Sequence, residues 1–434
     1  MTILDVFLEG LPAPVGALSR TSTGDLQFCY LRDDLAHPLS LSLSLSLPIR
    51  EAPFDDLPTR AFFENLMFEN AQRDQILQRY GLEFGDTVGL LTHLGRDCPG
   101  AVSVVPQGEG PGKLPGNLET DCDPIDNLQQ IMASLRDHRR LPPDTKDPSP
   151  LAGVEGKVAV ALLPDGRMAL PKAGLNVPTT HILKVPRRAD SRLVDHEHIL
   201  MQIARTVQPH PVGETAIIEV GDVRGLLITR FDRVINGPAV RRLHQEDFCQ
   251  ALGLGSALKY QRNGRGESVF DARGMGRILA QTDNPAGARQ ALFEGTVVNL
   301  LLGNTDNHAK NHALLYHGAR PQLAPFYDIV PILLDGNVTH QLAFDIGAAQ
   351  MTDEINPGDL ADFARALGYR RMIPALTMRL REITEDVIAH IGQMRGPVKK
   401  RVGDVIAEQA RWVAHALEFS PDIPERDLMV IVRP

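Results

Sequence analysis

The chain has 434 residues, of which 43% are hydrophobic and 23% charged, and its formal net charge is −9. This length is enough for a large core and for two or three domains. The acidic balance argues against a general nucleic-acid-binding or anionic-membrane surface, because both require an excess of basic residues.

Four cysteines, at positions 29, 98, 122 and 249, lie far apart and form no CxxC pair. This spacing favours free thiols in a reducing compartment over disulfides or a zinc site. The first residues lack a basic segment followed by an apolar run, and no stretch reaches the length of a membrane span. We therefore expect a cytoplasmic protein that does not insert into membranes.

The first hundred residues favour a small α/β module. Residues 39–47 alternate leucine and serine, which predicts a strand with one buried face; a low-complexity origin is the alternative. Apolar residues at helical spacing follow in 58–81. The glycine- and proline-rich stretch 106–116 predicts a linker, so we place a first domain at residues 1–116.

A sheet-rich region follows, and we assign it to residues 117–232. A short helix is expected at 125–139, a proline-rich break at 141–150 and a longer helix at 194–206. The expected strands are residues 158–163, 168–171, 181–185 and 216–231, with a tight turn at Asp165 and Gly166. This order is the outline of a nucleotide-binding lobe.

Beyond residue 231 the pattern becomes mainly helical, with apolar residues spaced three and four apart. The predicted helices are residues 244–253, 286–302, 357–368, 373–393 and 400–418. Residues 233–434 are therefore expected to form a helical lobe, and the predicted fold class is α+β.

The segment GNTDNHAKN at 303–311, followed by PFYD at 325–328, carries the most chemical information. An aspartate, an asparagine five residues later and a second aspartate seventeen residues after that match the arrangement in kinase active sites. Phosphoryl transfer needs a carboxylate that accepts the hydroxyl proton, which we assign to Asp306. It also needs hard oxygen ligands for magnesium, which suits Asn311 and Asp328.

Other interpretations of this segment stay open. Asx-rich turns that follow a helix produce the same residue types without catalysis. His308 and His312, four residues apart, also suit a transition-metal site, but the surrounding residues predict a loop and no further histidine or cysteine stands at ligand spacing. We expect His308 to support the loop or to contact nucleotide.

Three features upstream fit the same chemistry. LAGVEGK at 151–157 precedes a predicted strand and is a candidate phosphate-covering loop. Lys184 lies inside an apolar strand, where an unpaired lysine is unusual, and Glu197 follows in a predicted helix as its candidate partner. Taken alone, each has a simpler explanation: a common glycine pair, an exposed strand edge and a solvated helix face.

With these residues in view, the sequence resembles the HipA family of kinase toxins over nearly its whole length. The resemblance rests on residues 39–48, 62–66 and 97–102, and on PTTHILKVP at 178–186, TRFDR at 229–233, LHQEDFCQALG at 243–253, NTDNHAKNHALL at 304–315 and APFYDIVP at 324–331. LHQEDFCQALG together with the D-x-H-x-K-N loop is highly specific for the family.

The resemblance implies a two-lobed protein-kinase-like fold. It has a sheet-rich N-terminal lobe, an added HipA-type N-terminal module and a mainly helical C-terminal lobe. Asp306 is then the catalytic base, and Asn311 and Asp328 bind magnesium. The residues implied at ATP are Ala152, Gly153, Val154, Gly156, Lys184, Glu197, His308 and the hinge residues Arg230, Phe231 and Asp232.

The resemblance also implies ATP and Mg²⁺ as cofactors and a HipB-like helix-turn-helix antitoxin as partner, with DNA reached only through that antitoxin. A protein of translation, such as an aminoacyl-tRNA synthetase, is the implied substrate. Two other functions stay open. One is a small-molecule phosphotransferase of the aminoglycoside type, and the other is a weakly active kinase-fold corepressor of the antitoxin.

The chain departs from the family pattern near residue 150. Family members carry there a serine whose autophosphorylation switches the kinase off, whereas this chain has Pro150, preceded by Ser149. Glu155 and Thr229 also replace the usual residues of the loop and hinge. Because Pro150 has no hydroxyl, we expect control to fall on a bound antitoxin rather than on self-phosphorylation.

Overall fold

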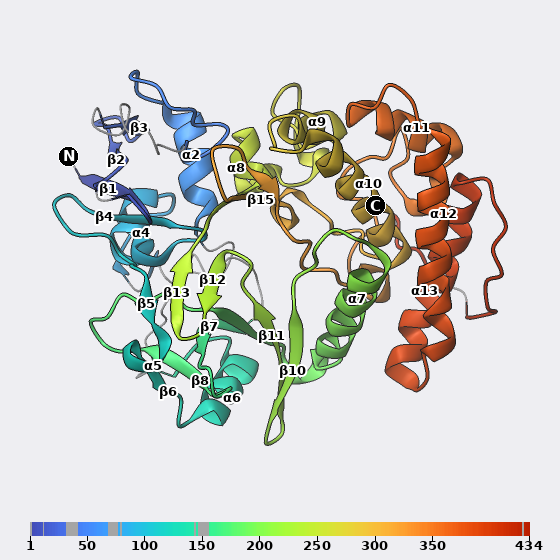
Figure 1. Cartoon of the computed structure of the whole chain (residues 1–434), viewed down its shortest axis with the longest axis horizontal. Coiled ribbons are helices and arrows are strands. Elements are labelled where there is room, and N and C mark those ends of the chain that lie inside the picture. Colours follow the sequence, from blue (N-terminus) through green and yellow to red (C-terminus); the bar gives the residue numbers. More distant parts are fainter. Residues whose placement is uncertain are drawn as a thin grey trace. The chain divides into compact units, whose positions relative to one another are not determined.

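The structure is a computed structural model that describes residues 2–11, 13–31, 42–67, 77–78, 80–142, 145, 156–427 and 429–434. The chain forms two compact units (Figure 1). The first unit comprises Met1–Asp190, Ala216–Ser256 and Leu314–Pro321, and the second comprises Ser191–Thr215, Ala257–Ala313 and Gln322–Pro434. Within the described ranges, no helix combines the length and the apolar character that crossing a bilayer requires.

The N-terminal part of the first unit is built on an antiparallel sheet in the order β3-β2-β1-β4. Its strands are β1 (Ile3–Leu8), β2 (Gly16–Arg20), β3 (Leu26–Tyr30) and β4 (Val102–Pro106), and its helices are α2 (Asp56–Asn65) and α4 (Thr87–Leu94). Phe28, Phe62 and Phe63 are fully buried and form an aromatic cluster between β3 and α2. Burying each ring contributes about 2–3 kcal/mol, so this cluster anchors the module.

The strand expected at 39–47 is not formed where the structure describes it. Residues 42–47 form a bend closed by one bridge between Ser44 and Leu47, and residues 39–41 lie outside the described residues. The Ser44 hydroxyl donates to the Glu246 carboxylate, and Ser46 donates to the Gln250 carbonyl at 2.7 Å. The serines therefore bind a distant segment of the first unit, which the alternating pattern did not reveal.

The second sheet of the first unit has the strand order β10-β11-β9-β7-β8-β6. The strands predicted at 168–171 and 181–185 are confirmed as β8 (Met168–Pro171) and β9 (His181–Val185). The expected hairpin forms, with Leu162 opposite Met168 and Gly166 at φ 87° in the turn. The remaining strands are β6 (Cys122–Pro124), β7 (Gly156–Leu162), β10 (Thr215–Val220) and β11 (Val223–Thr229), and α6 (Leu128–His138) packs on this sheet.

Two other expectations for the first unit need correction. The stretch 106–116 is not a loose linker, because Lys113 is 6% exposed and its ammonium donates to the Val177 carbonyl at 3.1 Å. The helix expected at 244–253 begins only at Phe248, since β14 (His244–Asp247) precedes α8 (Phe248–Leu252). Asp247 caps this helix with a capping box. The other short elements of this unit are β5 (Gly116–Asn117), α5 (Leu118–Asp121), β12 (Arg233–Asn236) and β13 (Ala239–Arg242).

The second unit is mainly helical, and the helices predicted at 286–302, 357–368, 373–393 and 400–418 are confirmed. Its longest helices α10 (Pro285–Leu301), α12 (Pro374–Ala389) and α13 (Pro397–Ala416) pack against one another (Figure 1). A proline at the first turn of each helix suits the position, where a backbone N–H has no helical partner. The other helices and strands are α7 (Leu193–Val207), α9 (Ala272–Leu279), α11 (Pro357–Ala366), β16 (Gln322–Leu323) and β15 (Ala313–Tyr316), whose last residues belong to the first unit.

Candidate functional site

The loop that carries Asp306 follows directly from helix α10. Gly303 has φ 71°, a left-handed conformation that favours glycine and that ends the helix sharply. The side-chain nitrogen of the buried Asn304 donates to the Asn299 side chain at 2.7 Å, and its side-chain oxygen Oδ1 accepts from the Asp306 backbone amide at 3.3 Å. The loop is therefore fixed to the last turns of a buried helix.

Asp306 is held from a second direction by Tyr260. The Tyr260 hydroxyl donates to Oδ1 of Asp306 at 2.6 Å, which leaves the other carboxylate oxygen for a further partner. Burial raises the pKa of Asp306, the Tyr260 hydrogen bond opposes it, and the nearby charge of Asp328 adds to the rise. The net effect is a raised pKa, which suits a carboxylate that accepts a proton.

Asn311 and Asp328 belong to the same unit as Asp306. The Asn311 amide nitrogen donates to the Asp306 carbonyl at 2.9 Å, so its carbonyl oxygen is the atom left for a cation. Asp328 has φ 58°, an uncommon left-handed conformation for a residue other than glycine. Such backbone strain is concentrated at functional sites. An amide oxygen and a carboxylate are the donors that magnesium prefers.

The segment before Asp328 is positioned by close packing. Phe326 lies so near α10 that a Cβ on Gly295 would approach its ring to 2.4 Å. The Phe326 amide donates to the Pro211 carbonyl at 2.9 Å, and its carbonyl accepts from Gly213 at 2.8 Å. Glycine at 295 is therefore required for Phe326 to reach this place, and Phe326 in turn places Asp328 two residues later.

The two histidines of the loop have different surroundings. His308 lies edge-on to the Tyr260 ring, with 5.2 Å between ring centroids. His312 is buried near Phe270 and Phe326, and burial lowers its pKa to about 4. Across the described part of the chain, no three histidine, cysteine, aspartate or glutamate side chains gather closely enough to hold a metal. His312 is thus a core residue, while a nucleotide contact of His308 stays a prediction.

In the first unit, Lys184 lies on β9 directly opposite Lys157 on β7. Two lysines opposite each other in an antiparallel pair point to the same face and repel one another. Two cationic groups on one face suit a polyanion such as a nucleotide phosphate. Lys157 is therefore an additional candidate phosphate-binding residue, which spacing alone did not single out. Gly156 pairs with Val185 in the same strands and packs against the Leu135 carbonyl.

Several predicted nucleotide contacts stay untested. Ala152, Gly153 and Val154 lie outside the described residues, as do Ser149, Pro150 and Glu155. Glu197 is 5% exposed in helix α7 of the second unit, and its pairing with Lys184 remains a prediction.

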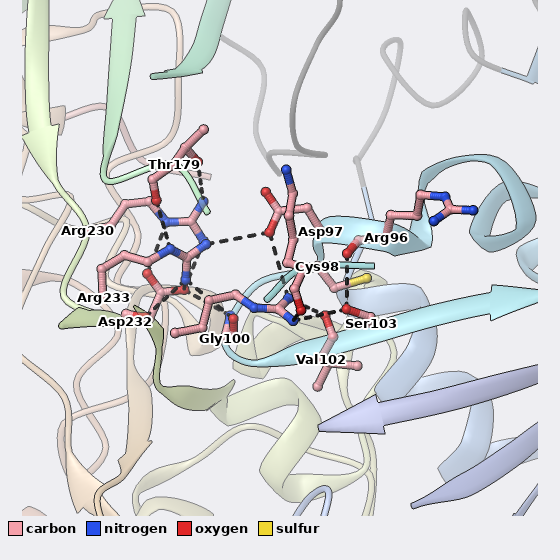
Figure 2. A network of polar contacts seen from close by, with 12 residues as sticks. Arg96, Asp97, Cys98, Gly100, Val102, Ser103, Thr179, Arg230, Asp232 and Arg233 are labelled. Atoms are coloured by element: carbon pink, nitrogen blue, oxygen red, sulfur yellow. Dashed lines mark hydrogen bonds and ion pairs between the residues drawn. The ribbon is translucent and has the colours of Figure 1, made fainter. Parts of the chain in front are cut away.

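The predicted hinge residues Arg230 and Asp232 face a buried charge network in the first unit, shown in Figure 2. Arg230 donates to both oxygens of Asp232 at 3.0 and 2.8 Å, and the Gly100 amide donates to Asp232 at 2.9 Å. Arg233 lies 2.8 Å from the same carboxylate and donates to the Thr179 carbonyl at 2.8 Å. The side chains of Arg230 and Asp232 are thus engaged in the protein interior.

The network continues into the N-terminal module. Arg233 and Arg242 lie 3.7 and 3.8 Å from Asp97, and Arg242 also pairs with Glu9 at 2.8 Å. Burial and the nearby positive charge of Arg230 together lower the pKa of Arg233 to about 10. If this hinge contacts a nucleotide, backbone atoms and the half-buried Phe231 would make the contact.

Comparisons with known proteins agree with this architecture. A HipA N-terminal domain matches residues 4–105, and a HipA-like C-terminal domain matches residues 149–394. A putative kinase of Sinorhizobium fredii, Y4mE, is 30% identical over 416 residues, which cover 94% of each chain. The serine/threonine-protein kinase toxin HipA of Shewanella oneidensis is 30% identical over 92% of this chain and 90% of its own.

A solved structure of Shewanella oneidensis HipA, in complex with HipB and operator DNA, is 27% identical and superposes with a TM-score of 0.77 over 96% of both chains. This match confirms the predicted class, an α+β protein-kinase-like fold with two lobes. The chain belongs to the HipA family of serine/threonine-protein kinase toxins.

Proposed function

We propose that this protein is an ATP- and Mg²⁺-dependent serine/threonine kinase that acts as the toxin of a toxin–antitoxin pair. The observation that carries the proposal is the geometry around Asp306. Tyr260 and the Asn311 amide fix this carboxylate and its backbone, and the pKa of Asp306 is raised. Transfer of phosphate to a hydroxyl needs such a proton acceptor, aligned and partly desolvated.

Asp306 accepts the proton of the substrate hydroxyl while that oxygen attacks the γ-phosphorus of ATP, and the bond from this phosphorus to the β-phosphate oxygen breaks so that ADP leaves. Asn311 and Asp328 would hold magnesium, which offsets the charge of the phosphates when bound. These two residues have suitable donor atoms for magnesium. Asn311 uses its side-chain nitrogen to bind the loop, so its side-chain oxygen can bind a cation, and Asp328 lies near enough to Asp306 for its negative charge to raise the pKa of Asp306. In the first unit, Lys184 and Lys157 supply cationic groups for the phosphates.

The cellular setting is proposed from the family. The match to the HipA–HipB–operator DNA structure supports a HipB-like antitoxin as partner, with DNA contacted through that antitoxin. The proposed substrate is a cytoplasmic protein of translation, such as an aminoacyl-tRNA synthetase, whose phosphorylation arrests growth. A cytoplasmic location accords with free cysteines among the described residues.

A second function remains a candidate for one reason. Glu155 stands where the family carries an amide in the phosphate-covering loop, and its carboxylate would repel the ATP phosphates and lower nucleotide turnover. The protein would then act mainly as a kinase-fold corepressor bound to its antitoxin. A small-molecule phosphotransferase is disfavoured, because both HipA domains match this chain.

The test is transfer of labelled phosphate from ATP into a cell lysate, followed by identification of the labelled protein. Wild type should label one or a few bands only when magnesium is present. Lys184→Ala should weaken ATP binding and transfer, because it removes a cation next to the phosphates. If this variant has the same ATP affinity and turnover as wild type, Lys184 is not part of the site. If wild type labels no protein, the kinase function is contradicted and the corepressor function is the one that remains.

A further inference from the structure

A cavity of about 300 Å³ lies in the second unit beside the candidate catalytic loop. Its lining includes Arg262, Arg265, Gln261, Asp345 and Gln350. The nucleotide contacts and the metal ligands predicted above do not use these residues. Five of its eight lining residues carry polar or charged side chains, so a polar or charged ligand suits it better than a wholly apolar one.

The cavity is connected to Asp306 through one short segment. Tyr260, which donates to Asp306, is followed immediately by the cavity residues Gln261 and Arg262. The Arg262 guanidinium carbon lies 4.1 Å from the centroid of the Tyr260 ring, and its positive charge lowers the pKa of Asp306. A group bound in the cavity would therefore lie close to the residue that receives the substrate proton.

The acidic group of the cavity, Asp345, is held in place by Gln261. Gln261 donates to the Asp345 carboxylate at 2.7 Å, and its carbonyl oxygen accepts from the Asp345 amide at 2.9 Å. Burial raises the pKa of Asp345, and a hydrogen bond from Gln350 partly opposes this rise. Asp345 is thus tied to Gln261 through both its carboxylate and its backbone, and one carboxylate against two guanidinium groups leaves the cavity with net positive charge.

The arginines, in contrast, have donors to spare. Arg265 donates to the carbonyls of Arg262 and Gly264 at 3.2 and 2.8 Å, and Arg262 makes one long bond of 3.4 Å to the Leu342 carbonyl. Each guanidinium carries five N–H donors. Among the residues that the structure describes, no carboxylate pairs with either guanidinium. The cavity thus offers unpaired positive charge and unused donors.

We propose that this cavity, the arginine pocket, binds an aspartate or glutamate side chain of the protein substrate, next to the hydroxyl that is phosphorylated. The inference rests on the proposed kinase function and names the class of its substrate: an acidic segment around the acceptor serine or threonine. Guanidinium groups match carboxylates in shape and charge, and such charge-assisted hydrogen bonds are roughly twice as strong as neutral ones.

The first test measures binding without catalysis. Fluorescence polarisation follows labelled peptides that carry one central serine and either aspartate, asparagine or lysine at each flanking position. Wild-type protein should bind the best aspartate peptide about tenfold more tightly than its asparagine counterpart, as one charge-assisted hydrogen bond predicts. Arg265→Glu should remove this preference, and Arg395→Glu, a charge reversal at an exposed site outside the pocket, should keep it.

Equal binding of the aspartate and asparagine peptides by wild type, or a preference that persists in Arg265→Glu, would overturn the proposal. Because Arg265 is exposed, its reversal should leave the melting temperature unchanged, which thermal denaturation checks. If Arg265→Glu does not fold, Arg265→Gln replaces it and should also lose the preference.

The second test measures phosphate transfer to the same peptides. Arg265→Glu should lower transfer to aspartate peptides about tenfold while transfer to asparagine peptides changes little. The two arms separate the hypotheses. Selective binding without any transfer would contradict the kinase function and support the arginine pocket. Transfer without selectivity would support the kinase function and contradict the arginine pocket.

Discussion

Asp232 is buried and Asp306 is half-buried, and their surroundings shift the pKa values of the two carboxylates in opposite directions. Burial raises the pKa of Asp232, but Arg230 and Arg233 more than offset it, so the pKa lies far below its usual range. Asp306 keeps a raised pKa, because burial and Asp328 outweigh Tyr260 and the more distant cations. An aspartate surrounded by arginines fixes structure, and one with a single neutral donor remains able to take up a proton.

The largest expected effect comes from removing the proton acceptor. Asp306→Asn should lower phosphate transfer about a thousandfold, because an amide cannot accept the hydroxyl proton. The melting temperature should change little, since the amide still accepts from Tyr260. Labelled-ATP transfer and thermal denaturation measure both quantities. Transfer close to that of wild type would remove Asp306 as the base.

The matching change in the first unit should act on stability. Asp232→Asn leaves Arg230 and Arg233 buried without their carboxylate, and breaking such a pair costs about 3–5 kcal/mol in the free energy of unfolding. Urea denaturation at neutral pH measures this cost. Asp165→Asn, at an exposed ion pair with Arg167, is the control and should change the free energy of unfolding far less.

The pH dependence of the Asp232→Asn effect follows from the sign of the pKa shift. A depressed folded-state pKa contributes stability above the unfolded-state value of 3.8, and this contribution is lost as the pH falls toward the folded-state pKa. The difference between wild type and variant should therefore shrink below about pH 4. A difference that stays constant with pH would contradict the charge-based explanation.

These two aspartates also show what the sequence could and could not predict. Asp306, Asn311 and Asp328 lie within one short stretch, so their spacing predicted phosphoryl transfer, and membership of a kinase family agrees with that class of chemistry. Strands β8 and β9 were predictable because each forms a local apolar pattern. Asp232 binds Gly100, 132 residues earlier, and Tyr260 precedes Asp306 by 46 residues. Periodicity reports which face is buried but not which distant group a polar side chain meets.

A third carboxylate, the fully buried Glu246, extends the comparison, because all its hydrogen-bond donors are neutral. It accepts from the Ser44 and Tyr316 hydroxyls and, at 3.0 Å, from the Leu45 amide. Burial raises its pKa to about 7, despite these hydrogen bonds. Three hydrogen bonds from neutral donors, without a cation nearby, are therefore not enough to keep the pKa of the buried Glu246 at its ordinary value.

This shift predicts a loss of stability as the pH rises. A folded-state pKa of about 7 against an ordinary 4.5 favours folding below pH 4.5, and that contribution disappears as the pH rises through 7. The full change is about 3 kcal/mol. Glu246→Gln should be less sensitive to pH than wild type between pH 5 and 8, as urea denaturation at several pH values would show. Parallel pH profiles for the two proteins would mean that Glu246 does not titrate there.

The smallest effect is expected at Tyr260, which distinguishes a positioning residue from a merely structural one. Tyr260→Phe removes the hydroxyl that donates to Asp306 at 2.6 Å, and this hydrogen bond lowers the pKa of that carboxylate. The maximal rate should fall about tenfold, and the acid limb of the pH–rate profile should move to higher pH, because Asp306 then holds its proton more tightly.

Tyr327→Phe is the matched control for this change, since the Tyr327 hydroxyl donates to the Lys310 carbonyl of the same loop at 2.7 Å but does not bind the base. Both variants lose one hydrogen bond to the loop, so both should lose a similar, small amount of stability. Only Tyr260→Phe should move the acid limb. If both variants shift it equally, the effect comes from the loop as a whole. If neither shifts it, the Tyr260 hydroxyl does not control the charge of Asp306 during the reaction.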